Sequence, residues 1–312
     1  MRYFFILFSI LFLSGCSSSK IKKDYVFPNA DGKAKYIQSY NNAFQKLWGV
    51  PFEEIDVRTS FGMAHVIVSG PISGEPIVLF HGMDASSSMW FPNVAALSKD
   101  FRVYAIDFPL EAGKSVASQN QLSNNQIVQY YNEVFVHFKM NNIHLMGASR
   151  GGWMAANLAI QPQNKIKSLI LLSPAQTFRG MKQPLKVLTA VKLKIIPNRK
   201  RLSRFFDTFS FYPDKIDDAY KEQFFLANKY GASKPRYTNM LKFSKKELNS
   251  LHIPVLVLVG DHDIVNDEKT LRSAQQLIPN VQTMLIKDAG HFLSIDQSAI
   301  VNKRIVDFLN QK

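Results

Sequence analysis

The chain has 312 residues, of which 46% are hydrophobic and 20% are charged, and its formal net charge at pH 7 is +14. This length supports one large domain or two small ones with a sizeable buried core, and the hydrophobic fraction excludes a disordered chain. The single cysteine, Cys16, leaves no pair for an intramolecular disulfide.

The first sixteen residues, MRYFFILFSILFLSGC, predict an export signal. Arg2 precedes an apolar run that ends at Leu13, which is too short to span a bilayer and is typical of a signal peptide. The segment Leu-Ser-Gly-Cys resembles the bacterial lipobox. This resemblance implies a signal peptide over residues 1–15, a diacylated Cys16, and a polar tether over residues 16–30. An ordinary secretory signal with an incidental cysteine is the alternative.

A lipidated Cys16 predicts a protein anchored in the cell envelope. The residue after it is Ser17, and not the aspartate that resembles an inner-membrane retention signal in some Gram-negative bacteria. If the source has two membranes, we therefore expect the outer one.

From about residue 55, β-rich runs alternate with helical patterns. The strand candidates are EIDVRT, MAHVIVSG, PIVLFHG, FRVYAID, NIHLMGA, KSLILLS, PVLVLVG and VQTMLIK. The middle ones are continuous apolar runs, as expected for parallel strands covered on both faces. Helical patterns occupy residues 124–140, the segment RGGWMAANLAI and the C-terminal AIVNKRIVDFL. The alternation predicts an α/β fold with an eight-stranded, mostly parallel, doubly wound sheet.

Residues 175–250 interrupt the alternation of strands and helices, because they hold no strong strand candidate but many basic and aromatic residues. They predict a helical cap inserted between two parts of the core, residues 31–174 and 251–312.

The cap contains 17 Lys and Arg against 6 Asp and Glu, a net charge of +11. A solvated basic face is one interpretation. The other is a cap that contacts an anionic membrane surface or attracts lipid-like or acidic substrates. Nucleic-acid binding fits the charge but not an exported lipoprotein.

The segment GASRGG, residues 147–152, raises the question of a catalytic serine. Gly147, Ser149 and Gly151 match the G-x-S-x-G pattern of a nucleophile elbow, in which the serine occupies a strained turn between strand and helix. An ordinary strand-to-helix turn also favours glycine, so the pattern alone does not assign Ser149.

A serine nucleophile needs a base and an acid that orients the base. The base candidate is His291 in KDAGHF, directly after the last predicted strand. The acid candidates are Asp261, Asp263 and Asp267 in LVGDHDIVND, and turns favour aspartate in any case. All follow predicted strands, at the edge where open α/β sheets build their sites.

The reaction also needs hydrogen-bond donors for the developing oxyanion. The segment LFHGMD ends the third predicted strand. Gly82 there would let the chain turn so that the backbone N–H of Met83 faces the serine. The backbone N–H of Arg150, at the start of the next helix, is the second candidate donor.

Over roughly residues 55–310 the sequence resembles the α/β-hydrolase superfamily, through IVLFHG, VYAID, GASRGG, VLVGDHD and AGHF. The resemblance implies an eight-stranded sheet, with Ser149 as nucleophile and His291 as base. It also implies Asp263 as the acid, because the family places its acid three residues after the strand-ending glycine, here Gly260.

Two further features follow from the resemblance. It implies that His81 has a structural role beside the oxyanion loop. The stretch DFPLEAGKS departs from the common D-x-x-G-x-G-x-S, because Leu110 replaces the first glycine and the stretch is one residue longer. We therefore expect the pocket shape to differ from that of many members.

The sequence thus predicts a lipid-anchored serine hydrolase that acts on a small-molecule carboxylic ester through an acyl-enzyme. A thioesterase, an aminopeptidase, a diketone hydrolase and an acyltransferase use the same triad and stay open. A non-catalytic binding protein on this fold is a further alternative. No cofactor is expected, and no nucleic-acid partner. No metal is expected either, since neither HExxH nor paired His and Cys spacing occurs.

Overall fold

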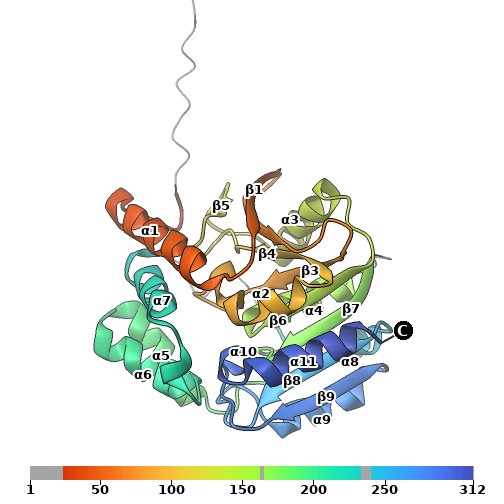
Figure 1. The fold of residues 1–312 in the computed structure, drawn as a ribbon. Helices are drawn as coiled ribbons and strands as arrows, with labels where there is room; N and C mark the ends of the chain where they lie inside the picture. Colours follow the sequence, from red (N-terminus) through yellow and green to blue (C-terminus); the bar gives the residue numbers. More distant parts are fainter. Residues whose placement is uncertain (1–23, 162–164, 233–239, 312) are drawn as a thin grey trace, which may run out of the picture.

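Figure 1 shows the computed structural model, which describes residues 24–161, 165–232 and 240–311. Cys16 and the predicted signal peptide therefore lie outside the described residues. The strands are β1 (Phe52–Thr59), β2 (Gly62–Ser69), β3 (Glu75–Phe80), β4 (Phe101–Ile106), β5 (Val116–Ala117), β6 (Ile143–Ala148), β7 (Ile166–Leu172), β8 (Val255–Gly260) and β9 (Val281–Ile286).

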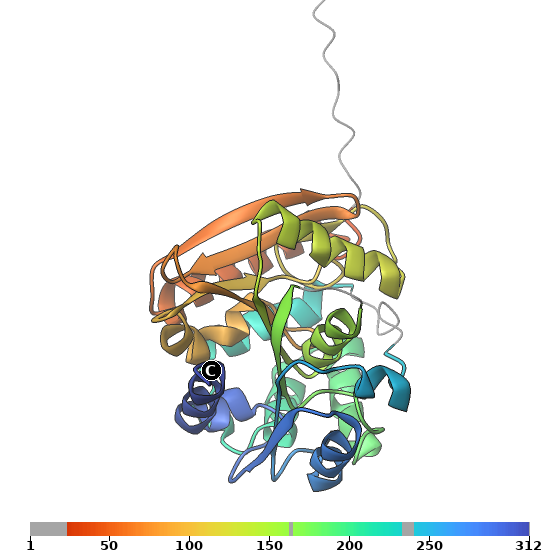
Figure 2. The same ribbon diagram turned by 90° about the vertical axis from the view of Figure 1, so that its right-hand side faces the viewer.

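These strands form one sheet in the order β1-β2-β4-β3-β6-β7-β8-β9, with β5 paired to β2. All pairs from β4 to β9 along this order are parallel, and the pairs that involve β2 are antiparallel. Figure 2 shows the sheet twisting from the β1–β2 hairpin to β9. Each of the eight predicted strands is present, and the mostly parallel, doubly wound sheet is confirmed. The ninth strand, β5, has two residues, too few for a hydrophobic pattern to show.

The helices are α1 (Ala30–Leu47), α2 (Phe91–Leu97), α3 (Asn124–His137), α4 (Arg150–Ile160), α5 (Pro184–Ile195), α6 (Arg199–Phe209), α7 (Asp218–Tyr230), α8 (Lys245–Asn249), α9 (Glu268–Leu277), α10 (Leu293–Asp296) and α11 (Ser298–Leu309), with the 3₁₀ turns η1 (Ser87–Trp90) and η2 (Pro213–Lys215). Among the described residues, no helix has the length and apolar composition needed to cross a membrane.

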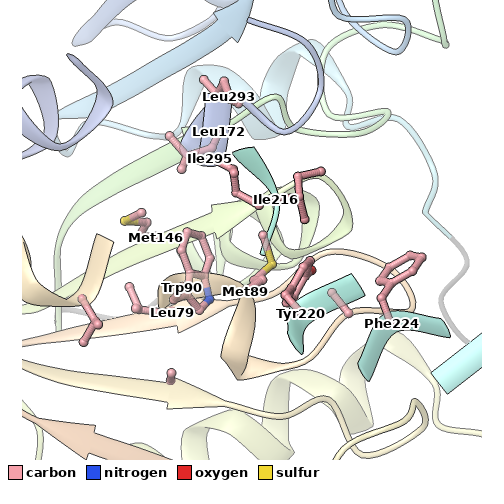
Figure 3. Packing of buried hydrophobic residues seen from close by; sticks show 14 of the residues in the cluster. Leu79, Met89, Trp90, Met146, Leu172, Ile216, Tyr220, Phe224, Leu293 and Ile295 are labelled. Atoms are coloured by element: carbon pink, nitrogen blue, oxygen red, sulfur yellow. The ribbon is translucent and has the colours of Figure 1, made fainter. Parts of the chain in front are cut away.

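The sheet is covered on both faces, because side chains alternate along each strand. In β3, Ile77 and Leu79 pack in an apolar cluster with α2 and α11, part of which Figure 3 shows. Val78 and Phe80 pack in a second cluster with α3, α4 and α9. The two helical layers lie on opposite sides of the sheet in Figure 2.

Helix α1 and the residues before it are an addition to the predicted elements. Asn29 caps the helix by accepting a hydrogen bond from the N–H of Gly32 at 3.0 Å. Tyr36 and Tyr40 are fully buried. Val26 and Phe27, which the sequence assigned to the tether, are also buried. The folded part of the chain therefore begins before residue 31.

Between β7 and β8 the chain forms α5, α6, α7 and α8. Figure 1 shows α5, α6 and α7 grouped beside one end of the sheet. Their contacts are rich in aromatic rings: Phe205 stacks on Phe209 and on Phe224, with ring centroids 4.5 and 4.9 Å apart. This segment is helical, as the sequence predicted, and the division of the chain at residues 175 and 250 stays a prediction.

Candidate active site

Ser149 lies at a sharp turn between β6 and α4. Its φ of 52° falls in the left-handed region, which is a strained conformation for a residue with a Cβ. A Cβ on Gly147 would lie 2.1 Å from the carbonyl oxygen of Gly151, and one on Gly151 would lie 1.9 Å from that of Phe80. Both glycines are therefore required by the close approach of β6, α4 and β3, which answers why they flank this serine.

His291 and Asp263 come together although they follow different strands. His291 lies in the loop between β9 and α10, and its Nδ1 is 3.0 Å from Oδ1 of Asp263. The Asp263 side chain is fully buried. Burial by itself would raise the pKa of Asp263, but the charge and hydrogen bond of His291 and the N–H of Val265 outweigh it and lower that pKa. The carboxylate therefore stays ionised beside the histidine.

The other two aspartate candidates point elsewhere. Asp261 Oδ1 lies 2.7 Å from Nδ1 of His262 and accepts the backbone N–H of Ala289. Asp267 caps α9 by accepting the N–H of Thr270. Of the three aspartates, only Asp263 contacts His291, as the sequence resemblance implies.

A residue that the sequence reasoning missed holds the histidine loop. The carboxylate of Asp296 is almost fully buried and accepts the N–H of Gly290 at 2.8 Å. It also accepts the N–H groups of Phe211 and Tyr212 and the hydroxyl of Ser210. The loop before His291 is thus tied to the end of α6. The one signal in the sequence is an acidic residue at the end of the apolar segment LSID.

The candidate oxyanion donors lie beside Ser149. Met83, Arg150 and Ser149 line the same cavity, and a Cβ on Gly82 would lie 3.6 Å from Cβ of Ser149. Among the described residues, neither the N–H of Met83 nor that of Arg150 donates to a protein acceptor. Two unused donors therefore stand next to the serine.

His81 has the structural position that the resemblance implies. Its Nε2 accepts the N–H of Phe108 at 2.8 Å, and its Nδ1 lies 2.8 Å from the carbonyl oxygen of Gly82. Burial, together with the charge of Arg150, lowers the pKa of His81 to about 4. The ring is therefore neutral at pH 7, and Nδ1 donates to Gly82.

Ser149 and His291 both line a cavity of about 150 Å³. Most of the remaining wall is apolar, and several of its side chains come from the segment between β7 and β8. They are Met181, Val187, Ala190, Leu193, Phe205, Phe209 and Phe224. No hydrogen bond joins the described side chains of Ser149 and His291, a contact that often tightens only when substrate binds. The cavity can hold an apolar group next to the serine.

Comparison with known proteins agrees with this architecture. The family described as "alpha/beta hydrolase fold" matches residues 75–298. The uncharacterized carboxylesterase nap of Bacillus subtilis is 30% identical over 291 residues, which cover 90% of this chain and 94% of that protein. Carboxylesterase YbfK of the same organism is 28% identical, over 93% of this chain and 98% of that protein.

A solved structure is similar over the same extent. The crystal structure of naproxen esterase from Bacillus subtilis superposes with a TM-score of 0.85 at 30% identity, and covers 90% of this chain and 99% of that one. The chain therefore belongs to the α/β-hydrolase family, as a carboxylesterase-like enzyme.

Proposed function

We propose that this enzyme hydrolyses carboxylic esters with Ser149 as nucleophile, His291 as base and Asp263 as the acid that orients the base. One observation carries the proposal. A histidine held by a buried carboxylate and a serine on a strained elbow line the same apolar cavity. A serine needs these two partners to react at neutral pH. The carboxylesterase relatives support an ester as substrate.

In the proposed reaction, Nε2 of His291 takes the proton of the Ser149 hydroxyl while Oγ bonds to the ester carbonyl carbon. The carbonyl oxygen becomes an oxyanion, which accepts hydrogen bonds from the N–H groups of Met83 and Arg150. Cleavage of the C–O bond releases the alcohol with the proton from His291 and leaves an acylated serine. A water molecule then attacks the acyl-enzyme in the same way, which releases the acid and restores the serine.

The apolar cavity wall favours an ester with an apolar acyl chain. The test is kcat/KM for aryl esters of increasing acyl length, with matched thioesters and amides, for the wild type and for Ser149→Ala. We expect ester hydrolysis to rise with acyl length until the cavity is filled, and to vanish in the variant. Preferred cleavage of the thioester or of the amide would instead indicate a thioesterase or an amide hydrolase that uses the same triad. A wild type that cleaves none would contradict the catalytic proposal.

We also propose that Cys16 carries the lipid anchor, which places the enzyme in the cell envelope and, where there are two membranes, in the outer one. The support is the lipobox resemblance around the only cysteine. The test is metabolic labelling with a fatty acid, followed by detergent partition and membrane fractionation. The wild type should be labelled and enter the detergent phase, and Cys16→Ser should do neither. Unlabelled wild type in the aqueous phase would contradict the anchor.

We further propose that the basic cap contacts an anionic lipid surface, with a plain solvated face as the alternative. Helix α5 exposes large apolar side chains at Leu185, Leu188, Val191 and Ile195, which lie three or four residues apart on one side of the helix. Lys186 and Lys192 on the same helix are exposed. An apolar helix face beside lysines is typical of a helix that lies in a membrane interface.

The basic residues in the first two turns of α6, Arg199, Lys200, Arg201 and Arg204, differ in their contacts. Arg199 pairs with Glu222 and lies over the ring of Phe225, and Arg201 donates to the carbonyl of Ile196. Lys200 and Arg204 are exposed. A charge reversal that tests the cap is therefore best made at Lys200 and Arg204, together with the two exposed lysines of α5.

The test compares binding to anionic and neutral vesicles of a variant that lacks residues 1–23. We expect it to prefer anionic vesicles, and the preference to disappear in about 0.5 M salt. Changing Lys186, Lys192, Lys200 and Arg204 to Glu should also remove it. The matched control changes four exposed lysines outside the cap, Lys99, Lys139, Lys165 and Lys269, to Glu. Equal effects of the two charge reversals would contradict a specific role of the cap.

A further inference from the structure

Glu111 is a buried carboxylate that the proposed reaction does not use. It lies in the loop after β4, within the DFPLEAGKS stretch that is one residue longer than the common family pattern, and only 4% of it is exposed. Burial raises the pKa of Glu111 to about 7, against the opposing effect of the Arg150 guanidinium. A buried carboxylate is retained only where its contacts compensate for its desolvation.

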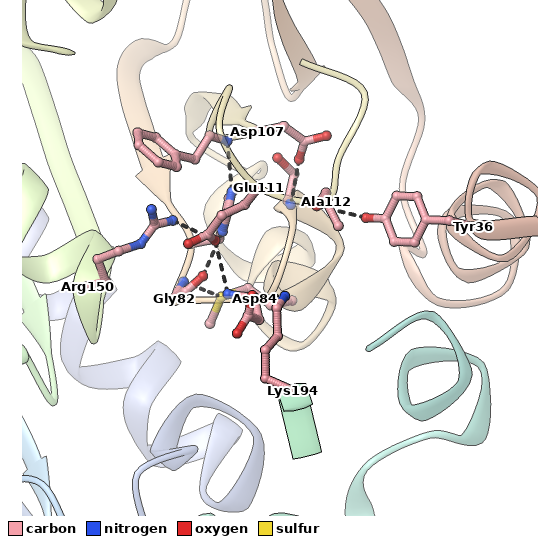
Figure 4. A network of polar contacts seen from close by, with 12 residues as sticks. Tyr36, Gly82, Asp84, Asp107, Glu111, Ala112, Arg150 and Lys194 are labelled. Carbon is pink, nitrogen blue, oxygen red and sulfur yellow. Dashed lines mark hydrogen bonds and ion pairs between the residues drawn. The ribbon is translucent and has the colours of Figure 1, made fainter. Parts of the chain in front are cut away.

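One oxygen of Glu111 joins the two segments that carry the candidate oxyanion donors. Oε2 accepts the backbone N–H of Asp84 at 2.9 Å and Nη2 of Arg150 at 2.9 Å (Figure 4). Asp84 directly follows Met83 in the chain, and Arg150 directly follows Ser149. A single atom therefore links the Met83 loop to the nucleophile elbow.

Both segments need such a link. Asp84 has a φ of 57°, a left-handed conformation that persists only when its surroundings hold it. The Arg150 side chain is buried, and its Nε and Nη1 have no hydrogen-bond partner among the described residues. Its guanidinium lies over the ring of Phe108 at 4.1 Å. Glu111 is thus the carboxylate that fixes Arg150 in this part of the structure.

The same loop is also contacted by the segment between β7 and β8. Nζ of Lys194, in α5, lies 2.8 Å from the carboxylate of Asp84 (Figure 4). Both partners are mostly buried, with side chains 16% and 18% exposed. The residue after Met83 is therefore held twice, by Glu111 through its backbone N–H and by Lys194 through its carboxylate.

From these contacts we propose that Glu111 is a positioning residue, which sets the distance and direction of the Met83 and Arg150 N–H groups toward the oxyanion. This inference rests on the proposed function, because it takes those two groups as the oxyanion donors. Such donors act only when they are directed at the position of the oxyanion, and the effect is specific to the transition state. Loss of Glu111 should therefore lower kcat and leave KM nearly unchanged.

The test measures kcat and KM of the full chain. A fluorophosphonate labels the reactive serine to completion, and kcat is expressed per labelled serine. In Glu111→Gln, we expect kcat about 10- to 100-fold lower and KM within about threefold of the wild type. Because labelled serines are counted, unfolded molecules do not contribute. The control is Asp107→Asn, a fully buried carboxylate that accepts the N–H groups of Ser87 and Lys114. It should lower the Tm but change kcat less than about threefold.

A second variant covers the case in which Glu111→Gln does not fold. Glu111→Leu combined with Arg150→Met replaces the ion pair by apolar side chains of similar size, a change that often preserves stability. A stable double variant with kcat at least about tenfold lower supports positioning. Wild-type kcat per labelled serine in either variant would overturn it and leave Glu111 with a structural role. An unlabelled wild type would instead reject the proposed function itself.

Discussion

Nδ1 of His291 lies 3.0 Å from Oδ1 of Asp263, across 28 residues of sequence. The two residues follow the parallel neighbours β9 and β8, whose carboxyl ends lie at the same edge of the sheet. The register of one strand pair therefore brings them together, and the buried carboxylate holds the ring in one orientation.

This contact predicts unequal effects of two neighbouring aspartates. Asp263→Asn should lower kcat by about 10⁴-fold, because the amide cannot stabilise the imidazolium that forms in the reaction. Asp261→Asn should stay within about tenfold of the wild type, because its carboxylate pairs with His262. Steady-state kinetics with an aryl ester checks both. The reverse order of effects would make Asp261 the acid.

The close packing at the elbow predicts that Gly151→Ala is destabilising, whereas the same change at an open glycine is not. Gly151→Ala should lower the free energy of unfolding by about 3 kcal/mol, because its Cβ would lie 1.9 Å from the Phe80 carbonyl oxygen. Gly180→Ala is the control, since nothing lies within 4 Å of its added Cβ. It should change stability by less than about 0.5 kcal/mol. Denaturant titration measures both, and equal losses would contradict the close approach at the elbow.

The raised pKa of Glu111 predicts how stability depends on pH. From the ordinary value of 4.5 up to about 7, the folded state keeps a proton that the unfolded chain releases, so this group lowers stability as pH rises. Glu111→Gln lacks this effect. The free energy of unfolding of the wild type, relative to the variant, should therefore fall by about 3 kcal/mol between pH 4.5 and 7. A constant difference would contradict a raised pKa.

The sequence predicted the parts of the fold that repeat a strong pattern. The continuous apolar runs of β3, β6, β7 and β8 could be read directly, because strands covered on both faces need no polar positions. The two-residue β5 gave no such signal. Helix α1 does carry a readable pattern, since its buried Tyr36, Tyr40, Ala43 and Phe44 recur at steps of three and four. It was missed because the search for elements began at about residue 55.

The residues of the candidate site also divide into those that the sequence predicted and those that it did not. Ser149, His291 and Asp263 stand in short motifs directly after strands, so their place at one edge could be expected. Asp296 stands in no such motif, and Glu111 stands in the stretch after β4 at a position to which the family pattern gives no role. Their roles depend on which backbone N–H groups and which guanidinium they meet across the fold, contacts that arise only from packing. The choice of aspartate shows where the residue pattern alone stops. Three carboxylates follow β8 within seven residues, and it took the family resemblance to select Asp263 and the geometry to show its contact with His291.

The most direct test of Ser149 as the nucleophile is the reaction of a fluorophosphonate with the wild type and with Ser149→Ala. Aryl-ester hydrolysis is measured for both proteins alongside it. We expect one labelled residue in the wild type, mapped to Ser149 by peptide mass spectrometry. Ser149→Ala should lose the label and about 10⁴- to 10⁶-fold in kcat, with an unchanged Tm. Label and ester hydrolysis that both persist in a folded Ser149→Ala would contradict the assignment of the nucleophile.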